Sequence, residues 1–190
     1  MKQGKLIIIS APSGCGKSTI INAIAQRGRV PFEFSVSATN RAPREGETNG
    51  VNYHFLTDEE FKSRIADGDF VEFEEVYPGR FYGTLKSEIE RRLASGINIV
   101  LDLDVKGGVN VKKMYSDSSL SIFIQPPSIE ALRDRLVNRG TETPASLADR
   151  IGRAEYELSF APQFDVTIVN DDLTTAINEA EARILSFINA

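Results

Sequence analysis

The segment APSGCGKST at residues 11–19 constrains the fold of this chain more than any other feature. It contains Gly-x-Gly-Lys-Ser, follows the apolar run LIII at 6–9, and opens a stretch with helical spacing that stops at Gly28. A glycine-rich turn between a buried strand and a helix is the context in which backbone N–H groups surround phosphate. The sequence therefore predicts a phosphate-binding loop within an α/β fold.

The residues of this loop have separate predicted roles. Its N–H groups surround the phosphates of a nucleoside triphosphate, Lys17 reaches the β- and γ-phosphates, and the Ser18 hydroxyl holds Mg²⁺. Ala11 stands where the usual pattern has glycine, and a glycine-rich turn with a surface lysine is the alternative. Cys15 has no identifiable histidine partner, so we interpret it as a small loop residue rather than a nucleophile. The predicted triphosphate-binding residues of the loop are Ala11, Pro12, Ser13, Gly14, Cys15, Gly16, Lys17, Ser18 and Thr19.

Length and charge narrow the functions open to the chain. A chain of 190 residues accommodates one domain, with or without a small insertion. Its formal net charge of -5 argues against nucleic-acid binding, which needs a net basic face. Cys15 is the single cysteine, and the N-terminal apolar run is too short for a signal peptide or a membrane span. We expect a cytoplasmic protein without nucleic-acid or membrane partners.

Apolar runs of strand length alternate with helical segments along most of the chain. The runs are rich in Ile and Val, as are strands buried on both faces. They are LIII at 6–9, INIVLDL at 97–103, LSIFI at 120–124 and VTIV at 166–169. The predicted helices occupy 18–27, 85–95 and 128–138, each followed closely by glycine, with two more that begin near Pro144 and Leu173. This pattern predicts a three-layer α/β/α fold around a parallel sheet.

Residues 34–84 have a different pattern. The segments FSVS, VNYHFL and FVEFEEVY alternate partly between apolar and polar residues. A helix is predicted between the last two at 57–67, where Thr57 and Glu60 form a capping box. We predict a small mixed or antiparallel β/α insertion in a core formed by 1–33 and 85–190. A substrate clamp and a purely structural excursion both fit this pattern.

Five further motifs lie in order along the chain. They are FSVSATNRAPREG at 34–46, FYGT at 81–84, LDLD at 101–104, RLVNRGTET at 135–143 and VNDD at 169–172. Together with the phosphate-binding loop, this ordered set resembles the guanylate kinases over essentially the whole chain. The resemblance implies ATP as phosphoryl donor, Mg²⁺, and GMP or dGMP as acceptor, with ADP and a guanosine diphosphate as products. It also implies that the insertion binds GMP.

The resemblance assigns the GMP phosphate to Arg41 and Arg44 together with Tyr53 and Tyr82. A dianion suits bidentate guanidinium donors flanked by phenolic hydroxyl groups. In isolation, the RAPR segment that holds both arginines is also typical of a solvated turn.

Recognition of guanine needs acceptors for its N1 and N2 donors and a hydroxyl group for O6. Glu72, Asp102, Ser37 and Thr84 match the family positions with those roles. Such pairing rejects adenine because the wrong base leaves buried polar groups unmatched. Glu72 also lies in an acidic segment that is typical of an exposed edge strand. The predicted GMP-binding residues are Ser37, Arg41, Arg44, Tyr53, Glu72, Tyr82, Gly83, Thr84 and Asp102.

The resemblance places Arg135, Arg139 and Arg150 in a mobile helical lid at about 135–153. Phosphoryl transfer is catalysed mainly by positioning and charge stabilisation, so arginines brought in by lid closure suit the reaction. The alternative is a solvated helix face with Asp134 and Asp149 as partners. The predicted catalytic residues are Lys17, Arg41, Arg135 and Arg150.

Two polar residues at strand ends have open roles. Asn170 matches the family position near the adenine, and the alternative is a helix cap, a role that Asp171 or Asp172 also fits. Asp104 follows an apolar strand at the edge where α/β sheets bind ligands, and we leave its role open.

Two other functions share parts of this pattern. A kinase for another nucleoside monophosphate or small acceptor would use the same loop, but Glu72 with Asp102 favours guanine. An inactive guanylate-kinase-like module that binds phosphorylated peptides would use the same arginines, but Lys17 and Ser18 favour catalysis. His54, the only histidine, is expected to be structural, because a phosphate oxygen of GMP is already a competent nucleophile. The sequence predicts no particular oligomeric state.

Overall fold

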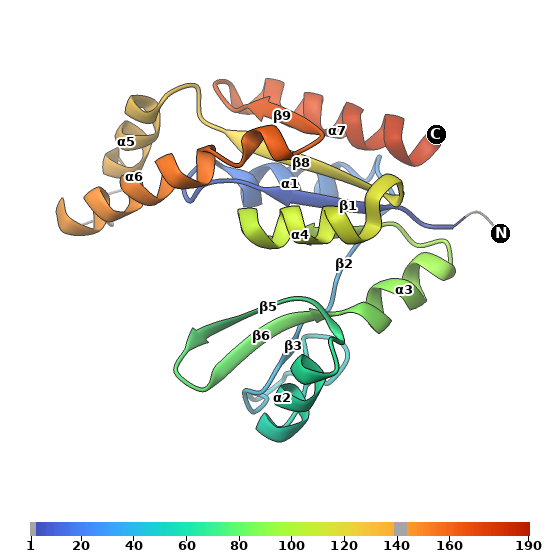
Figure 1. Ribbon diagram of the computed structural model, residues 1–190. Helices are drawn as coiled ribbons and strands as arrows, with labels where there is room; N and C mark the ends of the chain where they lie inside the picture. Colours follow the sequence, from blue (N-terminus) through green and yellow to red (C-terminus); the bar gives the residue numbers. More distant parts are fainter. Residues whose placement is uncertain (1–2, 139–143) are drawn as a thin grey trace.

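Five parallel strands form the core sheet of the computed structural model, which describes residues 3–138 and 144–190 (Figure 1). In spatial order they are β2 (Glu33–Phe34), β7 (Ile99–Asp102), β1 (Leu6–Ser10), β8 (Ser119–Gln125) and β9 (Val166–Val169). Ile8 of the fully buried β1 is opposite Leu101 on one side and Ser121 on the other. The predicted parallel core sheet is confirmed, with β1 at its centre.

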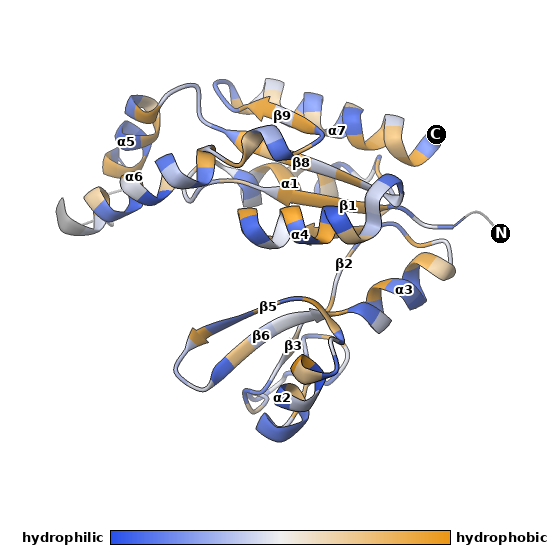
Figure 2. Cartoon of the chain, in the orientation of Figure 1, coloured by the Kyte–Doolittle hydropathy of each residue, from blue (hydrophilic) through white to orange (hydrophobic). Residues whose placement is uncertain are grey.

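Helices cover both faces of the sheet because apolar residues of β1 alternate between the faces. The face with Ile7 and Ile9 packs with α1 (Lys17–Arg27), α5 (Ile129–Asn138), α6 (Pro144–Leu158) and α7 (Leu173–Asn189). The face with Leu6 and Ile8 packs with α3 (Lys86–Ala94) and α4 (Val105–Tyr115). Figure 2 shows hydrophobic residues along β1 between these layers, so the three-layer α/β/α prediction is confirmed. None of the helices in the described part of the chain is long and apolar enough to cross a membrane.

A second, smaller sheet, here called the small sheet, lies apart from the core sheet, together with α2 (Asp58–Ala66) (Figure 1). In spatial order its strands are β4 (His54–Phe55), β3 (Ala38–Thr39), β6 (Arg80–Leu85) and β5 (Phe70–Tyr77). β3 and β4 are parallel and the other pairs antiparallel, as expected for a mixed sheet. Phe61 of α2 is fully buried and stacks on Phe70 and Phe81, with ring centroids 4.5 and 5.5 Å apart. The small sheet therefore has a hydrophobic core of its own.

The start of α2 confirms the predicted capping box. The Thr57 hydroxyl group accepts a hydrogen bond from the Glu60 backbone N–H at 3.1 Å, and the Glu60 carboxylate accepts one from the Thr57 N–H at 2.7 Å. Two N–H groups that lack partners inside the helix are thereby satisfied.

The predicted FSVS strand is wrong, because only Phe34 of this segment lies in a strand and residues 35–37 lie in none. Phe34 pairs with Val100 in the core sheet, whereas the small sheet begins at Ala38. The three residues between them carry the chain from one sheet to the other. Phe34 thus belongs to the core sheet rather than to the insertion in which we placed it.

The helix α4 was not predicted from the sequence. Gly107 and Gly108 in its first turn hide the helical pattern, because each glycine costs about 1 kcal/mol relative to alanine in a helix interior. Asp104 begins the helix by accepting a 2.6 Å hydrogen bond from the Gly107 N–H. A Cβ atom on Gly108 would lie 2.5 Å from Oγ of Ser10, so glycine permits close packing of α4 on β1. Asp104 therefore has at least one structural role, as a helix cap.

The cap of α7 resolves the choice among the three polar residues that precede it. The Asp172 carboxylate accepts hydrogen bonds from the N–H and hydroxyl groups of Thr175 at 2.8 and 2.7 Å. We expect Asp172→Ala to lower the melting temperature by about 2–4 °C, because a helix N-terminus loses its cap. Asp171→Ala removes the neighbouring charge but no cap, and its melting temperature is expected to stay within about 1 °C of wild type. Thermal denaturation followed by circular dichroism distinguishes the two, and equal shifts would contradict the assignment of the cap.

Candidate active site

The phosphate-binding loop joins the C-terminal end of β1 to α1, as predicted. Gly14 and Gly16 have φ values of 89° and 86°, a left-handed conformation that glycine adopts without steric cost. A Cβ atom on Gly16 would lie 2.5 Å from Nδ2 of Asn170. That nitrogen donates a 2.8 Å hydrogen bond to the Cys15 carbonyl, and the Asn170 side chain is buried. Asn170 therefore holds the backbone of the loop, while Asp172 caps α7.

The loop lines a cleft of about 810 Å³. Nζ of Lys17 donates a 3.1 Å hydrogen bond to the Leu103 carbonyl and forms an ion pair with Asp102. The exposed Ser18 lines the same cleft. All nine loop residues predicted to bind the triphosphate lie in its lining: Ala11, Pro12, Ser13, Gly14, Cys15, Gly16, Lys17, Ser18 and Thr19. A helix N-terminus, a cation and a hydroxyl group thus meet in one cleft, which suits a polyphosphate.

Cys15 is almost fully buried within the loop. Burial raises the pKa of its thiol to about 12, so the group is protonated at neutral pH. A protonated, buried thiol is a poor nucleophile. Cys15 therefore fits the interpretation as a small packing residue.

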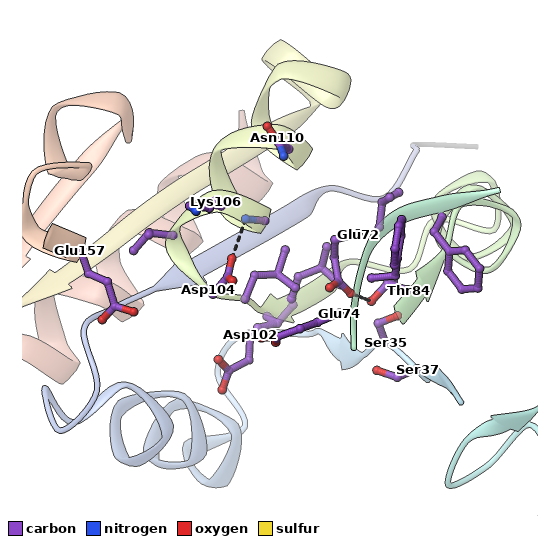
Figure 3. Close-up of a pocket in the computed structure, with 18 of the residues that line it drawn as sticks. Ser35, Ser37, Glu72, Glu74, Thr84, Asp102, Asp104, Lys106, Asn110 and Glu157 are labelled. Atoms are coloured by element: carbon purple, nitrogen blue, oxygen red, sulfur yellow. Dashed lines mark hydrogen bonds between the residues drawn. The ribbon is translucent and has the colours of Figure 1, made fainter. Parts of the chain in front are cut away.

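A second cleft, of about 820 Å³, lies between the two sheets (Figure 3). Four predicted guanine-binding residues lie in its lining: Ser37, Glu72, Thr84 and Asp102. Glu72 of β5 and Thr84 of β6 are cross-strand partners, and the Thr84 hydroxyl donates a 2.6 Å hydrogen bond to the Glu72 carboxylate. Burial raises the pKa of Glu72, while the hydrogen bond from Thr84 lowers it to a smaller extent.

Gly83 lies between Tyr82 and Thr84 in β6 and does not line either cleft. A Cβ atom there would lie 2.8 Å from the Glu72 carbonyl oxygen and 2.9 Å from Cβ of Phe73. Gly83 therefore allows the close approach of β5 and β6 that sets Glu72 opposite Thr84.

The two clefts share one wall. The residues that line both are Asp102, Leu103, Asp104, Arg153 and Glu157. In Figure 3, Asp102 and Asp104 lie between Glu157 on one side and Glu72 with Thr84 on the other. Ligands in the two clefts would therefore meet at the C-terminal end of β7, where parallel sheets commonly bind substrates.

A separate group lies in and beside the small sheet, outside the linings of both clefts: Arg41, Arg44, Tyr53 and Tyr82. The Arg41 guanidinium binds both carboxylate oxygens of Glu47 at 2.7 and 2.8 Å and lies 5.2 Å from the centroid of the Tyr53 ring. The Tyr53 and Tyr82 rings are 5.8 Å apart. Glu47 also accepts a 2.7 Å hydrogen bond from the Arg44 N–H. The structure therefore brings Arg41, Tyr53 and Tyr82 together, and Glu47 links Arg41 to the backbone of Arg44.

Glu47 was missed by the sequence analysis. The bond from Arg41 is the main cause that lowers the pKa of Glu47 to about 2, with a further contribution from the Arg44 N–H. The same bond raises the pKa of Arg41, so both groups stay charged. The signal was present as a glutamate three residues after Arg44, a spacing that reaches its backbone N–H in a turn.

Arg135 and Arg150, two of the predicted lid arginines, have contacts with the core. Arg135 donates hydrogen bonds to the carbonyl oxygens of Asn170 and Asp171 at 2.8 and 3.1 Å. Arg150 donates one to Oγ of Ser13 at 2.9 Å and lines the same cleft as the phosphate-binding loop. Arg139 lies outside the described residues. Two of the three arginines are thus beside the phosphate-binding loop or Asn170.

The sequence analysis also missed Arg153 and Glu157 of α6. Nε of Arg153 donates a 2.9 Å hydrogen bond to the Glu157 carboxylate, and both residues line both clefts. His54, by contrast, lines neither cleft, and its Nε2 lies 3.8 Å from the Glu88 carboxylate. This position agrees with the structural role expected for the histidine.

Comparison with known proteins gives a consistent family. Residues 3–186 match the family model described as guanylate kinase. Guanylate kinase of Bacteroides fragilis is 55% identical over 98% of this chain and 91% of its own, and that of Salinibacter ruber is 47% identical over the full length of both. A crystal structure of guanylate kinase from Anaplasma phagocytophilum has a TM-score of 0.69 and 29% identity, and covers 99% of this chain and 88% of that one. The chain belongs to the guanylate kinase family.

Proposed function

We propose that this chain is a nucleoside monophosphate kinase that transfers the γ-phosphoryl group of ATP to GMP, yielding ADP and GDP. One observation carries the choice of acceptor. The hydrogen-bonded pair of half-buried Glu72 and buried Thr84 lines a cleft that shares a wall with the cleft of the phosphate-binding loop. Its relatives in the guanylate kinase family support the same reaction. The reaction belongs to purine nucleotide metabolism, and the single cysteine suits the reducing cytoplasm.

ATP is proposed to occupy the cleft lined by residues 11–19. Lys17 would move from its ion pair with Asp102 toward the β- and γ-phosphates, and Arg150 lies at the same cleft. The Ser18 hydroxyl is the protein group that we propose for Mg²⁺. No group of three or more His, Cys, Asp or Glu side chains suited to a metal exists among the described residues. That fits Mg²⁺, which is commonly held by few protein ligands and by phosphate oxygens and water. When bound, it would neutralise charge that develops on the phosphates.

GMP is proposed to place its base in the cleft between the sheets. Ionised Glu72 and Asp102 would accept hydrogen bonds from N1 and N2, and the hydroxyl groups of Ser37 and Thr84 would donate to O6. The 2.6 Å bond holds Thr84 beside Glu72, and the Thr84 hydroxyl hydrogen would turn from Glu72 to O6 when guanine binds. N1 of adenine is an acceptor, so adenine would leave the carboxylates without a donor, and the cleft would bind guanine in preference. The ribose 2′ position has no assigned partner in this proposal, so dGMP is an acceptor as well.

The GMP phosphate is proposed to bind Arg41, Arg44, Tyr53 and Tyr82. Arg41 is held by Glu47 in two hydrogen bonds, a geometry that a phosphate can reproduce. Since this group lies outside both clefts, the proposal requires the insertion at about 34–84 to move toward the core at 1–33 and 85–190. The lid at about 135–153 would close from the other side and exclude water.

In-line transfer then needs no strong base. A GMP phosphate oxygen attacks the γ-phosphorus, the bond to the β-phosphate oxygen breaks, and ADP leaves. Lys17, Arg41, Arg135 and Arg150 would stabilise charge on the transferring group. The inactive binding module is not favoured by any relative or by the loop, which retains Lys17 and Ser18. In a kinase for another nucleoside monophosphate, the base would have to offer Glu72 a hydrogen-bond donor in place of guanine N1 or N2.

The raised pKa of Glu72 gives this proposal a pH signature. Only the ionised carboxylate accepts hydrogen bonds from N1 and N2, so protonation of Glu72 blocks guanine recognition. We expect kcat/KM for GMP to fall as the pH is lowered through the pKa of Glu72, at a higher pH than for an exposed glutamate, because burial raises that pKa. The pH profile of kcat/KM, measured at constant ionic strength, tests this. An acid limb that is unchanged in Glu72→Gln would assign the limb to another group.

A further inference from the structure

We propose that Arg153 is a further catalytic residue, which binds the phosphates where the ATP and GMP clefts meet, and that Glu157 positions it. This inference rests on the proposed reaction. Arg153 is in α6, one turn beyond Arg150. The resemblance of the chain to the guanylate kinases did not assign Arg153 to the site. Arg153 would supply a cation at the point of transfer, in addition to Lys17 at the loop.

The position of Arg153 is the first support for this role. It is the single lysine or arginine that lines both clefts within residues 3–138 and 144–190. Lys17 and Arg150 line only the triphosphate cleft, and Lys106 lines only the other. Once the insertion has moved toward the core as proposed, an in-line transfer brings the donor and acceptor phosphates together at the shared wall. A cation there contacts both phosphates at once.

The anchoring of Arg153 is the second support. Its Nε donates to Oε1 of Glu157 at 2.9 Å, while its side chain is 66% exposed and that of Glu157 only 9%. A guanidinium group has five N–H donors, and within the described residues the two Nη groups of Arg153 have no hydrogen-bond acceptor. Glu157 thus fixes one edge of the guanidinium from a buried position and leaves the other edge available in the cleft.

Glu157 itself is unusual. The residue is 7% exposed, and its second carboxylate oxygen, Oε2, is buried without a hydrogen-bond partner in the described part of the chain. A buried carboxylate oxygen without a donor is unfavourable, so a purely structural role for Glu157 leaves it unexplained. The bond to Glu157 and the charges of Glu74 and Asp104 raise the pKa of Arg153, which keeps the guanidinium charged.

The negative charge of the shared wall is the third support for this role. Asp102, Asp104 and Glu157 line both clefts, and Glu74 lines the GMP cleft. Two phosphate groups brought to this acidic wall would be repelled. A fixed arginine offsets that repulsion and stabilises the charge that develops on the transferring phosphoryl group.

Arg153→Ala and Arg153→Lys test the role of the guanidinium. We expect Arg153→Ala to lower kcat about 10- to 100-fold, with KM for ATP and GMP changed less than about threefold. The melting temperature should fall by a few degrees, because the buried Glu157 carboxylate loses its donor, while circular dichroism shows the fold retained. Arg153→Lys restores the charge without the fixed fork and should recover part of kcat. Added guanidinium ion should partly rescue Arg153→Ala and leave the wild type unaffected. The control is Arg183→Ala in α7, an exposed arginine 3.8 Å from Glu179 in the adjacent turn, which should stay within about twofold of wild type.

A double-mutant cycle tests the positioning role of Glu157. Glu157→Gln is expected to lower kcat about 5- to 10-fold in the wild-type background and to have no further effect in the Arg153→Ala background, because Glu157 acts through Arg153. Equal effects in both backgrounds would show a merely structural role. A kcat of Arg153→Ala within twofold of an active wild type would overturn the catalytic role. Inactivity of the wild type with GMP would instead contradict the proposed function itself.

Discussion

Replacing Lys17 by alanine is expected to lower kcat for ADP release with ATP and GMP by about 10³-fold. Lys17 is the cation of the phosphate-binding loop and lines the cleft proposed for ATP. Without it the charge on the β- and γ-phosphates loses a fixed partner as the transferring bond breaks. The loss should be mainly in kcat, because this charge is greatest in the transition state.

The fold should withstand the Lys17→Ala change. The ion pair of Lys17 with Asp102 is partly exposed, at 20% and 39% of the two side chains, and such pairs add little to stability. Circular dichroism and the melting temperature should match wild type. Lys113→Ala, which removes an exposed lysine at the end of α4, is the charge-matched control and should keep full turnover. Retention of a tenth or more of the wild-type kcat by Lys17→Ala would place the phosphates elsewhere.

Glu72→Gln is expected to lower kcat/KM for GMP by about 10²-fold or more. The glutamine side chain keeps the size of Glu72, but it presents an N–H₂ donor to the donor edge of guanine at N1 and N2. A polar site with the wrong pairing discriminates strongly because buried groups are left unmatched. The 2.6 Å bond from Thr84 can persist to the glutamine oxygen, so the loss reports base recognition rather than collapse of the hairpin.

Glu75→Gln is the matched control for this change. Glu75 lies in the same strand, β5, but outside the lining of either cleft, and accepts a 2.7 Å hydrogen bond from the Gly79 N–H that glutamine can also accept. Its kcat/KM should stay within about twofold of wild type. Steady-state kinetics with GMP as the varied substrate gives both values. A tenfold or smaller loss in Glu72→Gln would remove Glu72 from the guanine site.

The parts of the fold that were predicted from the sequence are those that neighbouring residues determine. β1 and the loop after it are contiguous, so one pattern fixed strand, turn and helix together. The capping box of α2 and the glycine after α1 mark those helix ends through bonds to neighbouring residues. Local hydrogen bonds of this kind can be recognised from spacing alone.

The parts that were missed depend on distant contacts. α4 has two glycines because its backbone approaches Ser10 of β1, a residue far away in the sequence, and the glycines obscured the helix. Phe34 and Ala38 are four residues apart yet pair in different sheets, with partners at Val100 and Gly83. The residues of FSVS do not indicate that the chain passes from the core sheet to the small sheet within this segment.

The residues of the candidate site also divide into those that a local pattern predicts and those that distant contacts bring together. The nine loop residues could be predicted as a group because they are consecutive, whereas Ser37, Glu72, Thr84 and Asp102 meet in one cleft from separate segments and were predicted through the family resemblance. Arg153 and Glu157 are four residues apart on a charged helix, a spacing typical of a solvated face. Their position at the shared wall follows from how α6 packs on the core, which the spacing does not encode.

The most direct test of the central claim is ADP release with MgATP and GMP, AMP, CMP or UMP in turn, at matched concentrations of the purified full chain. Strong turnover with GMP and little with the other three is the predicted result, because only guanine matches Glu72 and Asp102 with donors and Thr84 with an acceptor. Comparable or faster turnover with another monophosphate would contradict the guanine site and retain the kinase. No turnover with any of the four by the folded protein would contradict the reaction itself.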